Sequence, residues 1–194
     1  MRRKTFDTLV STAGLVVAAI LLIAGGLLTW ANNFVTDQVH DQLAAQKIFF
    51  PEAGDEAYED DRIGPYAEQY AGEQLVSGEQ AKVYADHYIA VHVADMSGDR
   101  TYAEVSAASR ANPDDEEAKA LVQTVFRGET LRGLLLNAYA FWKMGQIALY
   151  AAIVSFVGAG VFLVLSVLGF VHAGRTTSDE KLKLGSRTPA PVEP

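Results

Sequence analysis

Two long runs of the chain carry no Asp, Glu, Lys or Arg: residues 9–31, over 23 positions, and residues 146–173, over 28 positions. An α-helix rises ~1.5 Å per residue, so roughly 20 apolar residues cross the ~30 Å hydrocarbon layer of a bilayer. Each run is therefore long enough to span a membrane. In a chain of 194 residues, the two runs predict a small membrane protein with two transmembrane helices.

The first run also resembles a signal peptide, because Arg2, Arg3 and Lys4 precede it. The apolar core of a signal peptide is shorter, roughly 7–15 residues, and it ends in a cleavage site of small residues. Here the bulky Trp30 stands at the end of the run. We therefore expect a retained anchor, with the Trp30 indole at the level of the lipid headgroups.

Charge predicts the orientation of the two spans. The flanks at residues 1–8 and 174–194 together carry seven Lys and Arg against four Asp and Glu, whereas residues 32–145 carry nine against twenty. Cytoplasmic flanks of membrane spans are enriched in Lys and Arg. We therefore expect a plasma-membrane protein with both termini in the cytoplasm and residues 32–145 outside. The proline-containing tail at residues 174–194 is expected to be disordered.

The segment between the runs has helical patterns and no alternating strand pattern. Val35, Val39 and Leu43 continue the first run at four-residue steps, which extends the first helix to about Gln46. Residues 52–63 are acidic and rich in turn formers, and are expected to form an exposed loop. The predicted fold class is all-α: two transmembrane helices extended outward, enclosing a small extracytoplasmic helical bundle.

Capping residues mark the helix starts within this segment. Side chains of Ser or Thr three residues before Glu or Gln satisfy the first free backbone N–H groups of a helix, and proline is favoured in the first turn. The expected helices are residues 65–75 after Pro65, residues 78–96 after a capping box of Ser77 and Gln80, residues 102–111 after a capping box of Thr101 and Glu104, and residues 113–128 after Asn112-Pro113.

The sequence contains little catalytic chemistry. No cysteine is present, which excludes disulfides, thiolate nucleophiles and cysteine-based metal sites. No phosphate-binding glycine loop, serine-hydrolase motif or zincin motif occurs. The net charge of −8 argues against binding to nucleic acid. We therefore expect no catalytic residue, no bound metal, no cofactor and no nucleic-acid partner.

His87 and His92 are the two histidines that lie close together in the sequence. Five residues along an α-helix turn the second imidazole about 140° away from the first, which is unsuited to a shared metal ion. With Asp86 they leave open a metal-dependent enzyme as an alternative, but a structural role for each histidine is the favoured interpretation. The acidic runs at residues 59–61 and 114–117 lack the spacing of a calcium loop and are expected to be solvated surface.

Aromatic residues precede the second apolar run. A belt at the lipid headgroups explains Tyr139 and Trp142, and contact with a partner protein is the alternative. An Asn137 side chain in an apolar stretch is expected to form a hydrogen bond between helices. Small residues let helices approach closely. Ser11, Gly14 and Ala18 form one small-residue stripe in the first run, and Ala151, Ser155 and Ala159 form another at four-residue steps in the second. The predicted partner-contact residues are Phe49, Phe50, Asn137, Tyr139, Phe141, Trp142, Ala151, Ser155 and Ala159.

Three segments resemble a family of small actinobacterial membrane proteins with two spans. They are MRRKTFDTL at residues 1–9, DQLAAQKIFFP at residues 41–51 and RGETLRGLLLNAY at residues 127–139. The chain is also similar to the small accessory subunit, or association factor, of the actinobacterial respiratory supercomplex of cytochrome bcc and its terminal oxidase. The resemblance implies a subunit without haem or copper that packs beside the redox subunits and covers their outer face.

The leading hypothesis is therefore a non-catalytic accessory subunit that scaffolds an integral membrane complex, specifically this respiratory supercomplex. Its expected partners are other integral membrane subunits, including those of cytochrome bcc and the oxidase, and lipid. Two alternatives remain open at this stage. One is an envelope protein that acts outside respiration as an assembly factor or ligand-binding sensor, and the other is the metal-dependent enzyme.

Overall fold

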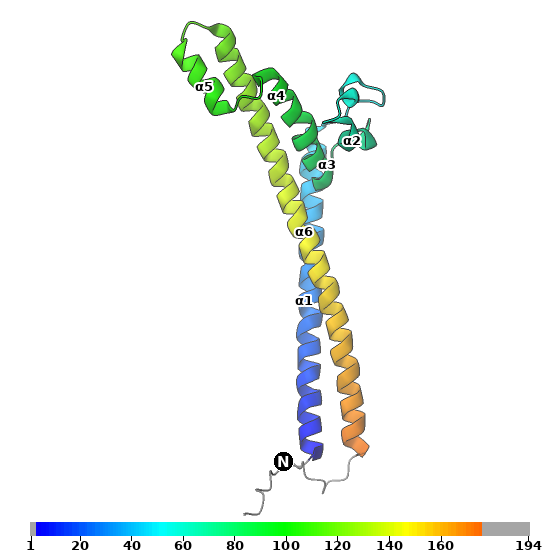
Figure 1. The fold of residues 1–194 in the computed structure, drawn as a ribbon. Helices are drawn as coiled ribbons and strands as arrows, with labels where there is room; N and C mark the ends of the chain where they lie inside the picture. Colours follow the sequence, from blue (N-terminus) through cyan, green and yellow to red (C-terminus); the bar gives the residue numbers. More distant parts are fainter. Residues whose placement is uncertain (1–2, 176–194) are drawn as a thin grey trace, which may run out of the picture. The chain divides into compact units, whose positions relative to one another are not determined.

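A computed structural model describes residues 3–175 of the chain (Figure 1). These residues are mostly helical and form no strand, apart from an isolated antiparallel bridge between Phe49 and Gln74. The predicted all-α class with two long apolar helices is confirmed. The elements are α1 (Arg3–Gln46), η1 (Glu56–Glu59), α2 (Gly64–Ala67), η2 (Glu68–Tyr70), α3 (Gly78–Val83), η3 (Tyr84–Ile89), α4 (Ala90–Ser97), α5 (Tyr102–Ala111) and α6 (Glu116–Arg175).

Both long helices lie in stretches without proline, because the first proline is Pro51 and none occurs between Pro113 and residue 189. α1 ends at Gln46, as predicted, and Lys47 follows in the left-handed conformation with φ 54°. α6 contains 60 residues and joins the expected helix at 113–128 to the second apolar run without a break. The expected tail at 174–194 lies outside the described residues, apart from its first two positions.

The start of α6 differs from the prediction. Pro113 lies in the turn after α5, and the helix begins only at Glu116. The Asp115 carboxylate accepts a hydrogen bond from the backbone N–H of Ala118 at 2.9 Å, so Asp115 caps the helix, which starts later than at the predicted Asn112-Pro113.

The chain divides into two compact units, and both long helices contribute to each. The two-helix unit contains Met1–Thr29 and Leu149–Pro194, and the helical unit contains Trp30–Ala148. In the two-helix unit, α1 and α6 run antiparallel (Figure 1). Glycines bring the two helices close: a Cβ atom at Gly14 would lie 2.6 Å from the Ser166 Oγ, and one at Gly169 would lie 2.1 Å from the Ser11 Oγ.

Small residues form the contact in the two-helix unit, including the predicted stripe of α1, but those of α6 follow a seven-residue period instead of the four-residue steps predicted. Ala159 is fully buried, whereas Ala151 and Ser155 are only half-buried. A seven-residue repeat keeps one side of each helix against the other when two helices cross at a small angle. The buried small residues of this repeat are Ser11, Ala18 and Gly25 in α1, and Ala152, Ala159, Ser166 and Ala173 in α6.

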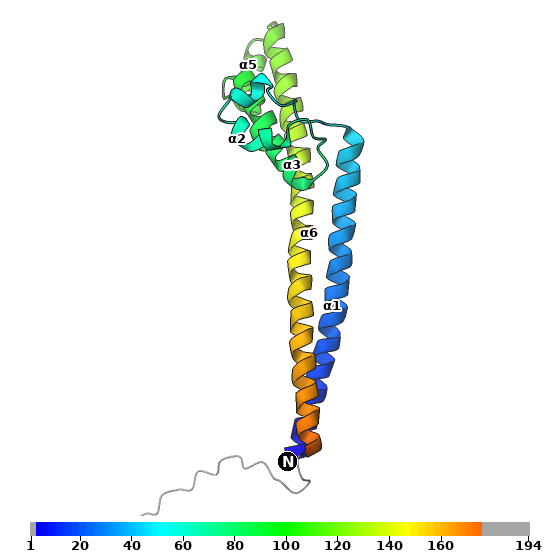
Figure 2. The ribbon, with the colours of Figure 1, turned by 90° about the vertical axis from the view of Figure 1, so that its right-hand side faces the viewer.

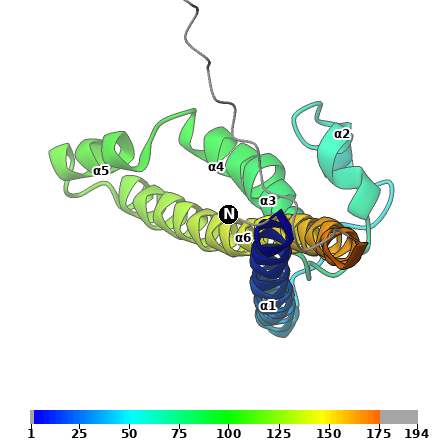
Figure 3. The same cartoon turned by 90° about the horizontal axis from the view of Figure 1, so that it is seen from below.

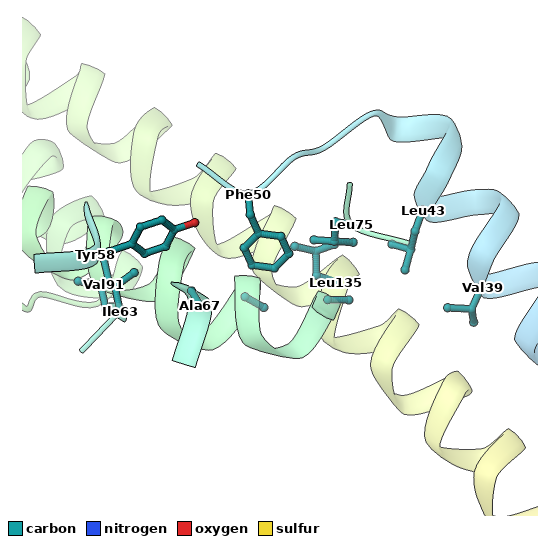
Figure 4. Close-up of a cluster of buried hydrophobic side chains, with 11 residues drawn as sticks. Val39, Leu43, Phe50, Tyr58, Ile63, Ala67, Leu75, Val91 and Leu135 are labelled. Carbon is teal, nitrogen blue, oxygen red and sulfur yellow. The ribbon is translucent and has the colours of Figure 1, made fainter. Parts of the chain in front are cut away.

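The helical unit has its own hydrophobic core, built from α1, α6 and the segments between them (Figure 4). Phe50 lies beside Leu75 and Leu135 in this core and is 2% exposed. Burial of a phenylalanine side chain of this kind stabilises a fold by about 1.5–3 kcal/mol. The buried members are Val39, Leu43, Phe50, Tyr58, Ile63, Ala67, Leu75, Ala81, Ala85, Val91 and Leu135.

Most residues of the acidic segment 52–63 are exposed, as predicted, but two of its side chains are anchored in the core. Tyr58 and Ile63 enter the core with exposures of 9% and 2%, and the Tyr58 hydroxyl donates a hydrogen bond to the Pro51 carbonyl at 2.7 Å. The carboxylates dominate the composition, but the two apolar side chains decide how the backbone packs.

The helix after Pro65 is also shorter than predicted, because α2 and η2 end at Tyr70.

Both predicted capping boxes are confirmed. Ser77 with Gln80 starts α3, and Thr101 with Glu104 starts α5. α3, η3 and α4 follow one another from Gly78 to Ser97, which matches the predicted helix at 78–96. These elements lie along α6 on the side away from α1 (Figures 2 and 3). α5 also packs on α6, through a second buried cluster of Val93, Val105 and Val125.

Tyr84 makes the stability of the helical unit sensitive to alkaline pH. Its ring packs edge-on against Phe50 at 5.2 Å between centroids, and this burial, with a smaller contribution from Tyr88, raises the pKa of Tyr84 to about 12. An unfolded tyrosine ionises near pH 10. The folded state therefore binds the phenolic proton more tightly, and the resulting stability is present below pH 10 and lost as the pH rises towards 12.

We expect the helical unit to lose stability between pH 10 and pH 12, and Tyr84→Phe to weaken that dependence. The check is chemical unfolding at pH 8, 10 and 11.5, followed by tryptophan fluorescence. Tyr150→Phe, in an exposed position of the two-helix unit, is the control. An equal alkaline loss in wild type and Tyr84→Phe would contradict the assignment.

Candidate partner-binding groove

A groove of about 410 Å³ lies between α1 and α6 within the helical unit. Four-residue steps along α1 direct glutamine amides into it, while the α6 side is mainly apolar. The groove contains no charged side chain in its lining, although residues 32–145 are strongly acidic. The lining residues are Phe34, Val35, Gln38, Val39, Gln42, Leu43 and Gln46 from α1, and Leu134, Asn137, Ala138 and Phe141 from α6.

The groove exposes large apolar side chains along its edges. Phe34 is 53% exposed, Leu134 is 61% exposed and Phe141 is 52% exposed. The floor is buried, because Val39 and Leu43 belong to the core described above. Side-chain amides can both donate and accept hydrogen bonds, so the glutamines beside this apolar floor suit an uncharged partner surface.

Two of the predicted partner-contact residues, Asn137 and Phe141, lie in this groove. The expected helix–helix hydrogen bond of Asn137 is not formed: its side chain is exposed and makes no hydrogen bond within residues 3–175. The physical reason is position, because Asn137 faces the groove and not the contact between α1 and α6. Its amide therefore remains accessible at the groove surface.

Tyr139 and Trp142 lie on another side of α6 and pack within the helical unit. A Cβ atom at Gly78 would lie 2.3 Å from the Trp142 Cβ, so the start of α3 lies directly against this tryptophan. The Lys82 ammonium lies 5.5 Å from the Tyr139 ring centroid. These intramolecular contacts hold both aromatic side chains on the helical unit, and each side chain remains half-buried.

The adjacent residues Phe49 and Phe50 have different environments. Phe50 is buried against the rings of Tyr70 and Tyr84, so it is not accessible to a partner. The centroid of its ring lies 5.3 Å from that of Tyr70. Phe49 is 54% exposed. In an extended segment, neighbouring side chains point in opposite directions. The sequence alone does not show which of the two phenylalanines faces the core.

The two histidines do not converge on a shared site. The His87 ring stacks on Tyr66 at 3.6 Å between centroids, and its Nδ1 lies 3.1 Å from the Arg62 carbonyl oxygen. The His92 Nδ1 lies 2.7 Å from the Tyr88 carbonyl oxygen. Within the part of the chain that the structure describes, no three His, Asp or Glu side chains are grouped so as to hold a metal ion.

Asp86, the third residue of the metal hypothesis, is paired with cations instead. Partial burial alone would raise its pKa, but a hydrogen bond from Lys82 and the charges of Lys82 and Arg132 outweigh burial and lower the pKa. Arg132 lies 3.5 Å from the carboxylate. The arrangement connects α6 to η3 and makes Asp86 a structural residue.

Sequence reasoning missed two features of this unit. One is η3, a π-helical turn at Tyr84–Ile89 that carries His87. The other is Arg62, whose guanidinium lies 2.6 Å from Asp60 and 2.9 Å from Asp95. Hydrogen bonds from Arg62 lower the pKa of Asp60 to about 2. Asp60 and Asp95 are far apart in the sequence, so no local signal marks this pairing.

Comparisons with models of protein families, with curated proteins and with solved structures found no match. The interpretation of the groove therefore depends on its chemistry and on its place in the chain.

Proposed function

We propose that the chain is an integral membrane protein in which residues 9–31 of α1 and 146–173 of α6 cross the plasma membrane. The support is the exterior of the two-helix unit, where large apolar side chains point outward. Ile23 is 65% exposed and Val154 is 71% exposed. Only 17% of the most apolar window of each helix is buried, unlike the core helix of a soluble protein. Lipid is the solvent that favours such a surface.

In this proposal both termini are cytoplasmic, and residues 32–145 form an extracytoplasmic helical domain. The excess of Lys and Arg in the flanks supports this orientation, as does the excess of Asp and Glu between the spans. Protease added to intact cells is then expected to cleave within residues 32–145 and to leave both ends intact. Cleavage of the ends alone would contradict the orientation.

The function proposed is a non-catalytic accessory subunit that binds other integral membrane subunits through the groove. The single observation that carries this proposal is an uncharged groove with exposed Phe34, Leu134 and Phe141 outside both apolar runs. These side chains lie beyond the proposed spans, which end near residues 31 and 146, so lipid does not cover them. Their exposure to water is unfavourable. A protein partner with an uncharged surface provides the missing contact.

The specific complex proposed is the actinobacterial respiratory supercomplex of cytochrome bcc and its terminal oxidase. This assignment rests on the resemblance of residues 1–9, 41–51 and 127–139 to a family of small actinobacterial membrane proteins with two spans, and on the separate similarity of the chain to the small accessory subunit of that supercomplex. The tagged chain, extracted from native membranes with a mild detergent, is expected to comigrate with haem-containing subunits on a native gel. Migration as a monomer would overturn the accessory-subunit proposal.

Phe141→Ala is expected to reduce recovery of the complex at least tenfold. Central aromatic residues of interfaces contribute about 2 kcal/mol or more, and ~1.4 kcal/mol corresponds to a tenfold change in affinity. The matched control is Phe126→Ala. Phe126 is another residue of α6 with 51% exposure, but it lies outside the groove and contacts Tyr102 at 5.8 Å between ring centroids.

The measurement is quantitative mass spectrometry of proteins that copurify with each variant from native membranes. Loss with Phe141→Ala but not Phe126→Ala supports the groove as the binding surface. Equal recovery of the complex with both variants would contradict it. A third outcome is that the copurifying membrane proteins contain no haem and are lost in Phe141→Ala. This result would overturn the respiratory assignment and favour an assembly factor or sensor that acts outside respiration.

A further inference from the structure

A second groove, of about 640 Å³, lies between α1 and α6 within the two-helix unit. Its walls are apolar and include Phe6, Val10, Phe162 and Leu165, while Asp7 and Ser166 provide polar atoms. Asp7 is the single Asp or Glu among the described residues of this unit. A carboxylate beside a membrane-exposed apolar surface is costly unless a specific partner compensates it.

The Asp7 carboxylate retains the capacity to accept a hydrogen bond. Its Oδ2 atom is buried and makes no hydrogen bond. The His172 Nε2 also lines the groove and lies 3.9 Å from Oδ2, which is within ion-pair distance but beyond hydrogen-bond distance. The neighbouring Ser11 hydroxyl donates to the Asp7 backbone carbonyl at 2.7 Å and not to the carboxylate. A ligand with an N–H or O–H donor would complete this site.

A second polar atom lies deeper along the same groove. Ser166 is 2% exposed, and its hydroxyl has no hydrogen-bond partner in the described structure. It lies opposite Gly14, seven residues beyond Asp7 along α1. Seven residues of helix correspond to ~10 Å. The groove therefore offers an anionic acceptor near the start of α1 and a hydroxyl donor about 10 Å further into the span.

This spacing matches the polar part of a glycerophospholipid. The headgroup layer occupies about 5–8 Å on each side of the hydrocarbon, with the ester groups at its inner edge. A headgroup ammonium can donate to the Asp7 carboxylate, while an ester carbonyl accepts from the Ser166 hydroxyl. The phosphate, which joins the amine to the glycerol esters, then lies between the depths of Asp7 and Ser166.

From this geometry we infer that the groove binds one phospholipid with a primary-amine headgroup. The amine pairs with Asp7, the ester region lies at Ser166, and the acyl chains cover the walls formed by Phe6, Val10, Phe162 and Leu165. The carboxylate favours a cationic headgroup, and the Asp7 Oδ2 atom without a hydrogen bond favours a primary amine, because choline carries a cation but no N–H donor. The inference rests on the membrane insertion proposed above.

Phosphatidylethanolamine and phosphatidylcholine provide a matched pair of probes, because both are zwitterionic but only the first has N–H donors. The purified full-length chain is equilibrated with mixed detergent micelles that contain equal amounts of these two lipids and phosphatidylglycerol. Native mass spectrometry then measures the lipid retained on each chain. We expect one phosphatidylethanolamine per chain, at least fivefold more abundant than either of the other lipids.

Asp7→Asn is expected to remove the preference, and Asp7→Glu to restore most of it. The control is Asp37→Asn, an exposed carboxylate further along the same helix. Ser166→Ala is expected to lower retention of phosphatidylethanolamine several-fold without changing its ranking. Equal retention of phosphatidylcholine, a preference for phosphatidylglycerol, or an unchanged preference in Asp7→Asn would each overturn the inference.

Failure of membrane insertion is measured separately. The same protein is reconstituted into vesicles of phosphatidylethanolamine and phosphatidylglycerol, washed at alkaline pH and floated on a density gradient. Protein that floats without a phosphatidylethanolamine preference contradicts the lipid site alone. Protein that is washed off contradicts the membrane proposal, and with it the lipid site.

Discussion

Gly128→Leu should lower the melting temperature of the helical unit by roughly 10 °C, whereas Gly133→Leu in the same helix should leave it unchanged or raise it slightly. A Cβ atom at Gly128 would lie 2.3 Å from the Val93 Cγ2, while nothing lies within 4 Å of one at Gly133. Val93 is buried at 5% exposure and, as a β-branched residue, has little freedom to rotate away.

The expected magnitudes follow from packing and helix propensity. Forcing extra methylenes into a filled core costs typically 1–3 kcal/mol and sometimes more. We expect Gly128→Leu to cost about 3 kcal/mol, at the upper end of this range, because it adds a whole leucine side chain. Replacing glycine within an open helix position gains about 0.5–1 kcal/mol. For a domain of this size, ~3 kcal/mol corresponds to roughly 10 °C.

Tryptophan fluorescence is a selective measurement here. Trp30 and Trp142 both belong to the helical unit, so the thermal transition of their emission reports on that unit and not on the two-helix unit. Melting temperatures that move in the same direction for both variants would contradict the contact between α4 and α6.

A chain carrying both Gly14→Cys and Ser166→Cys should form a disulfide between α1 and α6 almost completely under mild oxidation. A Cβ atom at Gly14 would lie 2.6 Å from the Ser166 Oγ, which brings the two sulfur atoms within bonding reach. The matched control is Gly26→Cys with Gly160→Cys. Both control positions lie in the same two helices, and neither has another atom within 4 Å of its Cβ position.

The natural chain has no cysteine, so the introduced pair is the only one present. After proteolytic cleavage between the two long helices, the fragments of the first variant should remain joined on a non-reducing gel and separate with reductant. The control fragments should separate under both conditions. Efficient joining of the control pair, or none in the Gly14 and Ser166 pair, would show that the helices pack through other faces.

The two long helices could be predicted from the sequence because their cause is local. Charge-free runs and the absence of proline favour continuous helix whatever surrounds them, and Ser77 and Thr101 cap their helices through side chains only three residues from their partners. The end of α1 at Gln46 followed from four-residue steps for the same reason.

The candidate sites could be predicted only in part. Asn137 and Phe141 were identified as partner-contact residues, and both lie in the groove of the helical unit. The α1 side of that groove was missed, because Gln38, Gln42 and Gln46 appear as ordinary solvated positions of an amphipathic helix. A single helix pattern does not show where a second helix leaves a neighbouring face uncovered.

By itself, the amino-acid sequence determined the helical class, the two long apolar helices and their capped neighbours, since each depends on residues within a few turns of one another. Only the tertiary structure decided that Phe50 is buried while Phe49 is exposed, and that small residues meet every seven positions. It also brought Asp7 and Ser166 into one groove. The physical reason is that burial and pairing depend on distant segments meeting, and no local pattern encodes which side of a helix they meet.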